Sequence, residues 1–296
     1  MMVLIGKTNI DFISKRFVFF AVSAVLIAVG VISLAVKGLN LGLDFTGGTL
    51  LQVQFEAPVT TAQVRASMSK AGLETAIQSF TGRNAYQLRV KGSQDNVNEV
   101  ADKMLAGFAA SFPGNKFTEE KRDYVGPVVG RDLAKKALFA VVLSLFGIIV
   151  YVAFRFSNPV WGAAGVVSLM HDVFIAMAAL SVTNREIDLV VVAALLTIAG
   201  YSINDTIVIF DRMRENMRMF PKMNIGKLVN TSVNETLSRT LLTNLTVLTV
   251  VAVLFFIGGE VINNFAFAML VGSICGTYST IAIATPLVYQ WENKGK

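Results

Sequence analysis

One carboxylate lies inside a stretch that otherwise has the composition of a membrane-spanning helix. Asp205, preceded by Asn204, belongs to the sequence GYSINDTIVIF over residues 200–210. An ionisable side chain at the centre of a span costs about 2.5 to 3.5 kcal/mol, so such a group is expected to be paired, protonated or next to a polar cavity. The alternative is a hydrogen-bonded packing residue, a role that asparagine fills at lower cost. Asp205 is therefore the strongest candidate for a functional residue.

Arg239 is the candidate partner of Asp205. It stands in SVNETLSRTLLTNL, residues 232–245, near the entrance of the next apolar stretch, at a depth similar to that of Asp205 near the exit of its own. Helical spacing predicts that Thr236, Arg239, Thr240, Thr243 and Val247 share one face of this helix. The hydroxyl groups and the guanidinium make this face polar, so it could border a water-filled path. The alternative is an interfacial anchor that extends to water and pairs with Glu235.

His171 and Asp172 are a second ionisable pair, near the middle of another apolar stretch. His171 is the only histidine in the chain, and histidine titrates near neutral pH. The pair is either a proton relay or a hydrogen-bonded helix contact. We expect no metal site, because no second histidine or cysteine stands at ligand spacing, and no catalytic residue. The residues expected to support the coupling are Ser202, Asn204, Thr206, Thr236, Thr240, Thr243, Asn244, His171 and Asp172.

The composition explains why these polar groups are unusual. Hydrophobic residues make up 54% of the 296 residues and charged residues only 16%, whereas soluble domains average about a quarter charged. About 20 apolar residues in a helix match the hydrocarbon core of a bilayer. Six stretches qualify: 17–36, 137–154, 159–182, 187–210, 240–259 and 265–291. The sequence predicts a polytopic α-helical membrane protein with six transmembrane helices.

The distribution of basic residues predicts the orientation. Lysine and arginine are concentrated in residues 1–16, in a loop of about residues 211–235 and in residues 292–296, whereas the short loops of the other side hold only Arg185. Basic residues favour the cytoplasmic side, so both termini are predicted to be cytoplasmic. The net charge of +6 reflects this orientation, and we expect no nucleic-acid partner.

Residues 37–136 have the composition of a soluble domain. Strands are predicted at 49–55, 75–81, 85–90 and 117–125, with helices after the capping box of Thr60 and Gln63 and over residues 97–108. This βαββαβ order is the ferredoxin-like arrangement. We interpret the domain as a binding or lever module. Asp44, Gly47 and Gly48 are hinge candidates where the first span meets it.

Four motifs give a family resemblance that covers nearly the whole chain. They are LGLDFTGGTL at 41–50, HD at 171–172, GYSINDTIVIFDRMREN at 200–216 and SVNETLSRTLLTNLTVL at 232–248. With one span, an outer domain and five further spans, the chain resembles the SecF family, the smaller partners in the SecD–SecF protein-export pair. That resemblance implies a membrane half of the resistance-nodulation-division type, a periplasmic domain and a location in the bacterial inner membrane.

The resemblance also implies a mechanism. Members of this family assist the Sec translocon by drawing preproteins outward, driven by protons. By motif match, Asp205 would carry the proton and Arg239 would respond to its state. The implied partners are SecD as a separate chain, the Sec translocon channel, an unfolded preprotein and membrane lipids, and the only coupling ion is the proton, with no cofactor.

Other functions stay open at this level. A proton-driven exporter of small molecules would be expected to have larger outer domains. A scaffold that stabilises the translocon would use Asp205 only as a hydrogen-bonding residue. An intramembrane protease also uses paired aspartates, but no protease motif surrounds Asp172 or Asp205.

Overall fold

The computed structural model describes residues 8–80, 82–91, 97–156 and 158–294. The predicted terminal segments 1–16 and 292–296 lie partly outside the described residues, as does Thr81 at the end of a predicted strand. The elements are, in chain order, α1 (Arg16–Val36), α2 (Leu43–Thr46), β1 (Gly48–Phe55), α3 (Thr61–Lys70), β2 (Ala76–Ser79), β3 (Ala85–Lys91), α4 (Val97–Ser111), β4 (Phe117–Val125), α5 (Pro127–Arg155), α6 (Pro159–Val182), α7 (Leu189–Met219), α8 (Ile225–Ile257), α9 (Glu260–Ser279), the π-helical turn η1 (Thr280–Ala284) and α10 (Thr285–Lys294).

The chain forms two compact units. Met1–Asn40 and Ala140–Lys296 make the membrane unit, and Leu41–Phe139 makes the sheet unit. Within the described residues, six helices are long and apolar enough to cross a membrane: Arg16–Val36, Pro127–Arg155, Pro159–Val182, Leu189–Met219, Ile225–Ile257 and Val261–Asn293. Each of them contains or overlaps one of the predicted stretches.

The helices extend further than the hydropathy pattern predicts. The segment 211–235, predicted as a cytoplasmic loop, is mostly helical, and only residues 220–224 separate α7 from α8. Charged pairs one turn apart support this polar helix, since Arg212 bonds Glu215 and Arg214 bonds Asp211. Asn224 caps the start of α8 by accepting from the backbone of Gly226. The prediction located the apolar part and missed the helical continuation.

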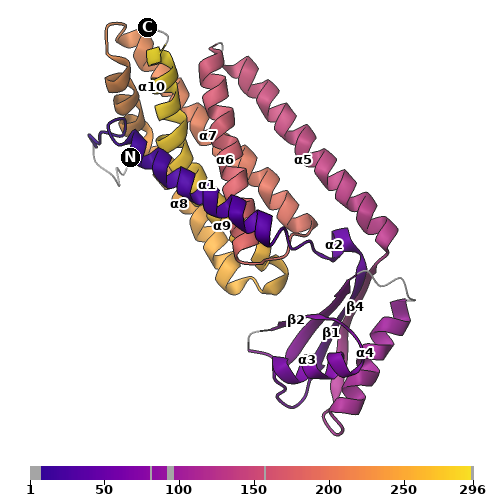
Figure 1. The fold of residues 1–296 in the computed structure, drawn as a ribbon. Helices are drawn as coiled ribbons and strands as arrows, with labels where there is room; N and C mark the ends of the chain where they lie inside the picture. The colour runs from indigo at the N-terminus through magenta and orange to yellow at the C-terminus, as the bar shows by residue number, and fades with distance from the viewer. Residues whose placement is uncertain (1–7, 81, 92–96, 157, 295–296) are drawn as a thin grey trace. The chain divides into compact units, whose positions relative to one another are not determined.

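The sheet unit has one antiparallel sheet with strand order β2-β3-β1-β4. Its elements follow the order βαββαβ, as predicted, and Figure 1 shows α3 and α4 beside the strands. The capping box is present, because Thr60 accepts from the backbone of Gln63 while the Gln63 side chain accepts from the backbone of Thr60. β2 is shorter than predicted.

The core of the sheet unit follows the alternation of β1. Leu51, Val53 and Phe55 are at most 1% exposed, and the intervening glutamines are less buried. They pack on α3 through Met68 and on α4 through Phe108, which places both helices on one face of the sheet. Apolar residues spaced for one face of a strand and one stripe of each helix therefore specify this layer.

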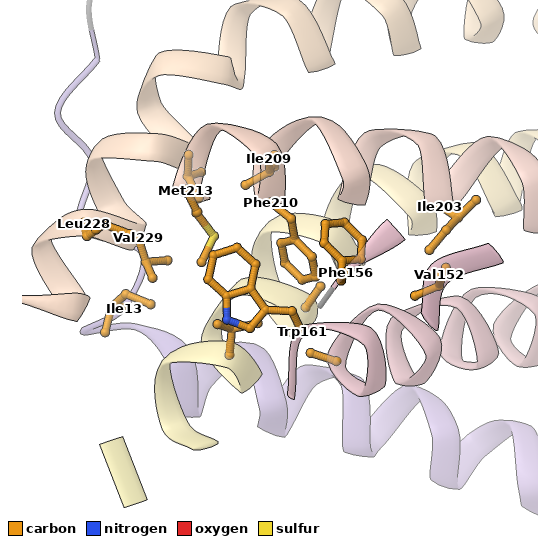
Figure 2. Packing of buried hydrophobic residues seen from close by; sticks show 14 residues of the cluster. Ile13, Val152, Phe156, Trp161, Ile203, Ile209, Phe210, Met213, Leu228 and Val229 are labelled. Atoms are coloured by element: carbon orange, nitrogen blue, oxygen red, sulfur yellow. The ribbon is translucent and has the colours of Figure 1, made fainter. Parts of the chain in front are cut away.

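An aromatic cluster fixes α7 within the membrane unit. Phe210 of α7 contacts Phe156 and Trp161 with ring centroids 5.4 and 5.6 Å apart, both edge-on. Figure 2 shows these rings together with Met213 of α7 and Val229 of α8. Phe210 is 0% exposed, so the cluster sets the rotation of α7 about its own axis. That rotation determines where Asp205, five positions earlier, points.

Candidate functional site

Asp205 lies on the buried face of α7. The residue is 4% exposed, and its Oδ2 accepts a hydrogen bond from Nδ2 of Asn244 on α8 at 2.6 Å. Asn244 also donates to the carbonyl of Thr240, while its Oδ1 and the Thr240 hydroxyl are buried without a hydrogen-bond partner. A carboxylate that gains a proton becomes a donor. The site therefore holds an acceptor, Oδ1 of Asn244, that can serve a protonated Asp205 once the amide turns.

Arg239 does not pair directly with Asp205. No ion pair joins these two described residues, and the Arg239 side chain is exposed. It lines a cavity of about 500 Å³ together with Val208, Asp211, Arg212, Glu215, Glu235 and Thr236. The alternative partner, Glu235, instead accepts from Arg212 of α7 at 2.7 Å. Neither pairing expected for Arg239 is present in the described residues, because Arg239 lies at the exposed cavity while Asp205 is buried against Asn244 and Glu235 is bonded to Arg212.

A buried polar stripe on α8 connects this cavity with Asp205. Thr236, Thr240 and Asn244 recur every four residues and are 8%, 1% and 2% exposed. Thr236 lines the cavity, and Asn244 bonds Asp205. Thr243 is less buried and donates to the carbonyl of Arg239 on its own helix. The predicted polar face is thus divided: its threonines at 236 and 240 turn inward, whereas Arg239 and Thr243 do not.

The polar residues of α7 have separate roles. Ser202 donates to Oδ2 of Asp172 on α6 at 2.5 Å, and Thr206 lies 3.1 Å from the hydroxyl of Thr280 in η1. Asn204 is exposed on the outer face of the helix, away from its neighbour Asp205. Asn204 was predicted to support the coupling at Asp205, but in the structure it is not part of the buried polar group around Asp205.

The second carboxylate, Asp172, joins three helices. Its Oδ1 lies 3.0 Å from Nδ1 of His171, and its Oδ2 accepts from Ser202 of α7 and from Ser279 of α9 at 2.6 Å. Ser279 was not identified from the sequence. The polar run GTYST at 276–280 is the only sequence signal for it.

Gly47 and Gly48 lie in the sheet unit, where close packing explains them. Gly48 has φ +138°, and a Cβ there would lie 2.1 Å from the carbonyl oxygen of Val90 on β3. Gly47 has φ +69°, with Pro127 close by. Asp44 is in the first turn of α2. These contacts require glycine for reasons other than mobility, and the hinge role of these three residues stays a prediction.

The N-terminal segment holds the first turns of α8. The amide of Asn230 donates to Asp11 at 2.7 Å, and the Asn234 side chain accepts from the backbone of Ile10 at 2.9 Å. Hydrogen bonds from Ser14 and Asn230 lower the pKa of the Asp11 carboxyl. The residues that the structure describes include no group of three or more histidine, cysteine or acidic side chains that could hold a metal ion.

Comparisons with known sequences give two matching families. The SecD/SecF protein-export membrane protein C-terminal family matches residues 108–294, and the SecD/SecF GG motif matches residues 32–59, which include Gly47 and Gly48. A protein translocase subunit SecF of Endomicrobium trichonymphae is 39% identical over 97% of this chain and 93% of its own length. One from Calditerrivibrio nitroreducens is 42% identical over 96% of this chain and 94% of its own.

A solved structure is similar over almost the whole chain. The crystal structure of SecDF, a translocon-associated membrane protein from Thermus thermophilus, superposes with a TM-score of 0.87 at 35% identity over 99% of this chain. A SecDF structure in a super-membrane-facing form gives a TM-score of 0.74. This chain spans 40% of the length of either SecDF chain.

Proposed function

Because the chain belongs to the SecD/SecF family of protein-export membrane proteins and is an accessory subunit of Sec translocation, we propose that proton binding at Asp205 drives its contribution to export. The observation that carries this proposal is the hydrogen bond from Asn244 of α8 to the buried Asp205 of α7. A proton crossing the full membrane field releases about 2.3 kcal/mol per 100 mV, which is enough to bias two arrangements of packed helices.

The attachment of α8 supports Asp205 as the control point. Over residues 236–254 of α8, all of them described, the only hydrogen bond to another helix is the one from Asn244 to Asp205. In contrast, Asp172 joins α6 to α7 and α9, and Thr206 joins α7 to η1. Neutralising Asp205 therefore weakens the one polar contact that holds this part of α8, while the other helices keep theirs.

The proton path to the cytoplasmic side follows the polar stripe. Protons would pass from the cavity at Thr236, past Thr240, to Asn244 and Asp205. Arg239 at this cavity is proposed to respond to the charge of Asp205 through space rather than through a direct ion pair. Asp211, Glu215 and Glu235 line the same cavity as Arg239, so its lining carries both signs of charge.

The proposed location of the two units follows from the basic residues. Both termini would be cytoplasmic in the bacterial inner membrane, and the sheet unit would be a periplasmic ferredoxin-like domain. The order βαββαβ and the strand order β2-β3-β1-β4 support that assignment of the fold. The sheet unit would contact the unfolded preprotein and transmit the movement of the helices.

The proposed partners are a separate SecD chain, the Sec translocon channel, the preprotein and the surrounding lipids. The SecDF chain of Thermus thermophilus, of which this chain spans 40%, supports the need for a SecD half. We propose no enzymatic activity and no cofactor besides the proton.

Preprotein release from membrane vesicles tests this function. Vesicles that contain the translocon, SecD and this chain are compared with and without a proton gradient for the wild type, Asp205→Asn and Arg239→Met. Thr243→Val is the matched control, because Thr243 lies beside Asn244 but bonds only its own helix. We expect the gradient to accelerate release in the wild type and the control but not in Asp205→Asn. Normal acceleration in Asp205→Asn would leave only the scaffold role.

A further inference from the structure

An apolar groove opens on the membrane unit, and the proposed proton path does not run through it. Its volume is about 530 Å³. Phe12 and Phe19, before and inside the start of α1, line one end, and leucines of α8 and Ile274 of α9 form two further walls. Leu245 and Ile274 are each more than half exposed, so the groove is open to the surroundings of the helices.

The polar side chains in the groove are already bonded within the protein. The Thr277 hydroxyl donates to a carbonyl of its own helix at 3.0 Å, and the Tyr278 hydroxyl donates to the carbonyl of Phe19 at 2.7 Å. Asn244 donates to Asp205 at 2.6 Å. The groove therefore offers water few hydrogen bonds, and an apolar occupant is favoured over water.

The dimensions of the groove favour a flexible chain over a further helix. Residues 241–248, which include its α8 wall, span about 10 Å along the helix axis. Over that length the volume corresponds to a mean cross-section of about 50 Å², less than the roughly 80 Å² of a helix 10 Å across. A neighbouring helix could cover the groove but could not fill it, whereas an acyl chain can.

Two basic residues lie at one end of the groove. Lys15 and Arg16 stand between Phe12 and Phe19, the two residues of this segment that line it. Neither forms an ion pair with an acid in the part of the chain that the structure describes, and Asp11, the nearest acid in sequence, is bonded to other side chains. Basic residues at the end of a transmembrane helix attract anionic lipid headgroups. The groove thus has an apolar interior and a positively charged end, which matches an anionic phospholipid.

We infer that the groove binds an anionic phospholipid, with one acyl chain between α1 and α8 and the headgroup at Lys15 and Arg16. Its placement in the cytoplasmic leaflet rests on the proposed orientation of the chain, but lipid binding itself does not. The acyl chain would exclude water from the side of α8 where Asn244 meets the groove. The cavity at Thr236 would then remain as the aqueous route to Asp205.

Photocrosslinking tests the inference on the full-length chain in complex with SecD. Nanodiscs of phosphatidylglycerol or of phosphatidylcholine contain a trace of the same lipid with a diazirine in one acyl chain. Mass spectrometry then measures the label on residues 241–248 and 274–282 of the groove. Residues 138–146 of α5 are the reference for ordinary lipid contact, because Leu138, Phe139 and Phe146 are each more than 60% exposed.

We expect several-fold more label on the groove than on α5 in phosphatidylglycerol, and a smaller excess in phosphatidylcholine. Equal labelling of the two regions, or an excess that is the same in both lipids, would overturn the inference. Labelling of the isolated chain that disappears when SecD is added would also overturn it, because SecD would then cover the groove.

Two substitutions that fill the groove separate a bound lipid from a passing one. Leu245→Trp and Ile274→Trp each enlarge an exposed side chain, so neither requires the core to repack. In each variant the label is measured on the opposite wall, where it should fall to the level of α5. Val250→Trp is the matched control, because Val250 is equally exposed on α8 but does not line the groove. Wild-type labelling in both groove variants would contradict the assignment.

The headgroup contact is tested with Lys15→Gln, which removes one positive charge from an exposed side chain. We expect the preference for phosphatidylglycerol over phosphatidylcholine to fall about fivefold. Lys222→Gln, a change at an exposed lysine between α7 and α8, should leave the preference unchanged. An equal effect of both changes, or none in Lys15→Gln, would overturn the choice of an anionic lipid. These measurements need no proton gradient, so their failure is distinguishable from failure of the proposed function.

Discussion

Replacing Asn244 by leucine should uncouple the chain from the proton gradient without unfolding it. Leucine branches at Cγ as asparagine does but is larger, and Asn244 borders an apolar groove lined by Leu241, Leu245 and Leu248 that leaves room for the larger side chain. The substitution removes the 2.6 Å hydrogen bond to Asp205, the only one that ties residues 236–254 of α8 to another helix in the described structure. The charge state of Asp205 then no longer has a direct effect on α8.

The size of the effect follows from the type of bond. A hydrogen bond to a charged group contributes about 1.5 to 3 kcal/mol, which corresponds to roughly a 10- to 150-fold change in the equilibrium between two helix arrangements. In the wild type, protonation of Asp205 would exchange this bond for a weaker one between neutral groups, worth about 0.5 to 1.5 kcal/mol, and so reduce the bias. In Asn244→Leu this hydrogen bond is missing whether Asp205 is charged or neutral. Proton binding at Asp205 then no longer favours one helix arrangement over the other through this bond.

The assay is the ratio of preprotein release rates with and without a proton gradient in translocon vesicles. We expect a ratio near one for Asn244→Leu and a wild-type ratio for Thr243→Val, whose hydroxyl bonds only the carbonyl of Arg239. Complex formation with SecD should be normal for both variants. Full acceleration by the gradient in Asn244→Leu would refute the reasoning, since the chain would then couple through contacts other than this hydrogen bond.

Three further predictions concern the sheet unit, and each is measured on the full-length chain. Gly48→Ala should disrupt the pairing of β1 with β3, because a Cβ would lie 2.1 Å from the carbonyl oxygen of Val90; increased protease cleavage in the sheet unit is the readout, and wild-type resistance would contradict it. Phe108→Ala should destabilise the sheet unit by about 3 to 5 kcal/mol, since Phe108 is 0% exposed in its core; denaturant unfolding measures this, and a loss below about 1 kcal/mol would contradict it. Arg122 lowers the pKa of Glu119 through a hydrogen bond at 2.7 Å, so this pair stabilises the folded unit above the usual pKa of 4.5 and the contribution is lost as the pH falls below it. Both side chains are partly exposed, so the effect should be below about 1 kcal/mol, and Glu119→Gln should flatten the acid limb of the melting temperature; an unchanged limb would show that the pair is neutral in energy.

Local patterns predicted the elements of the sheet unit well. The alternation of Leu51, Val53 and Phe55 identified a half-buried strand, and Thr60 with Gln63 identified the start of a helix. Both patterns reflect interactions between residues close in sequence, so they predict the local structure without knowledge of the tertiary fold. The spans were predicted for the same reason, because the length of an apolar run is a local property.

The candidate site was predicted less completely because it depends on helix rotation. The similar depths of Arg239 and Asp205 predicted that they would be paired, but the rotation of α8 buries Thr240 and Asn244 and leaves Arg239 exposed at the cavity. The aromatic packing of Phe210 with Phe156 and Trp161 sets the rotation of α7 through contacts distant in sequence. Asn244 was expected only as a supporting residue, and Ser279 was not identified at all. One sequence carries no signal for which face of a uniformly apolar helix meets which neighbour.

The most direct test of the central claim is the ionisation of Asp205 during the working cycle. Difference infrared spectroscopy of ¹³C-aspartate-labelled protein in vesicles, with and without a proton gradient, separates carboxylate from carboxylic acid. The account predicts a carboxylic-acid band that responds to the gradient in the wild type and is absent in Asp205→Asn. An identical difference spectrum for the wild type and Asp205→Asn would contradict it, because Asp205 would then keep one protonation state while the protein works.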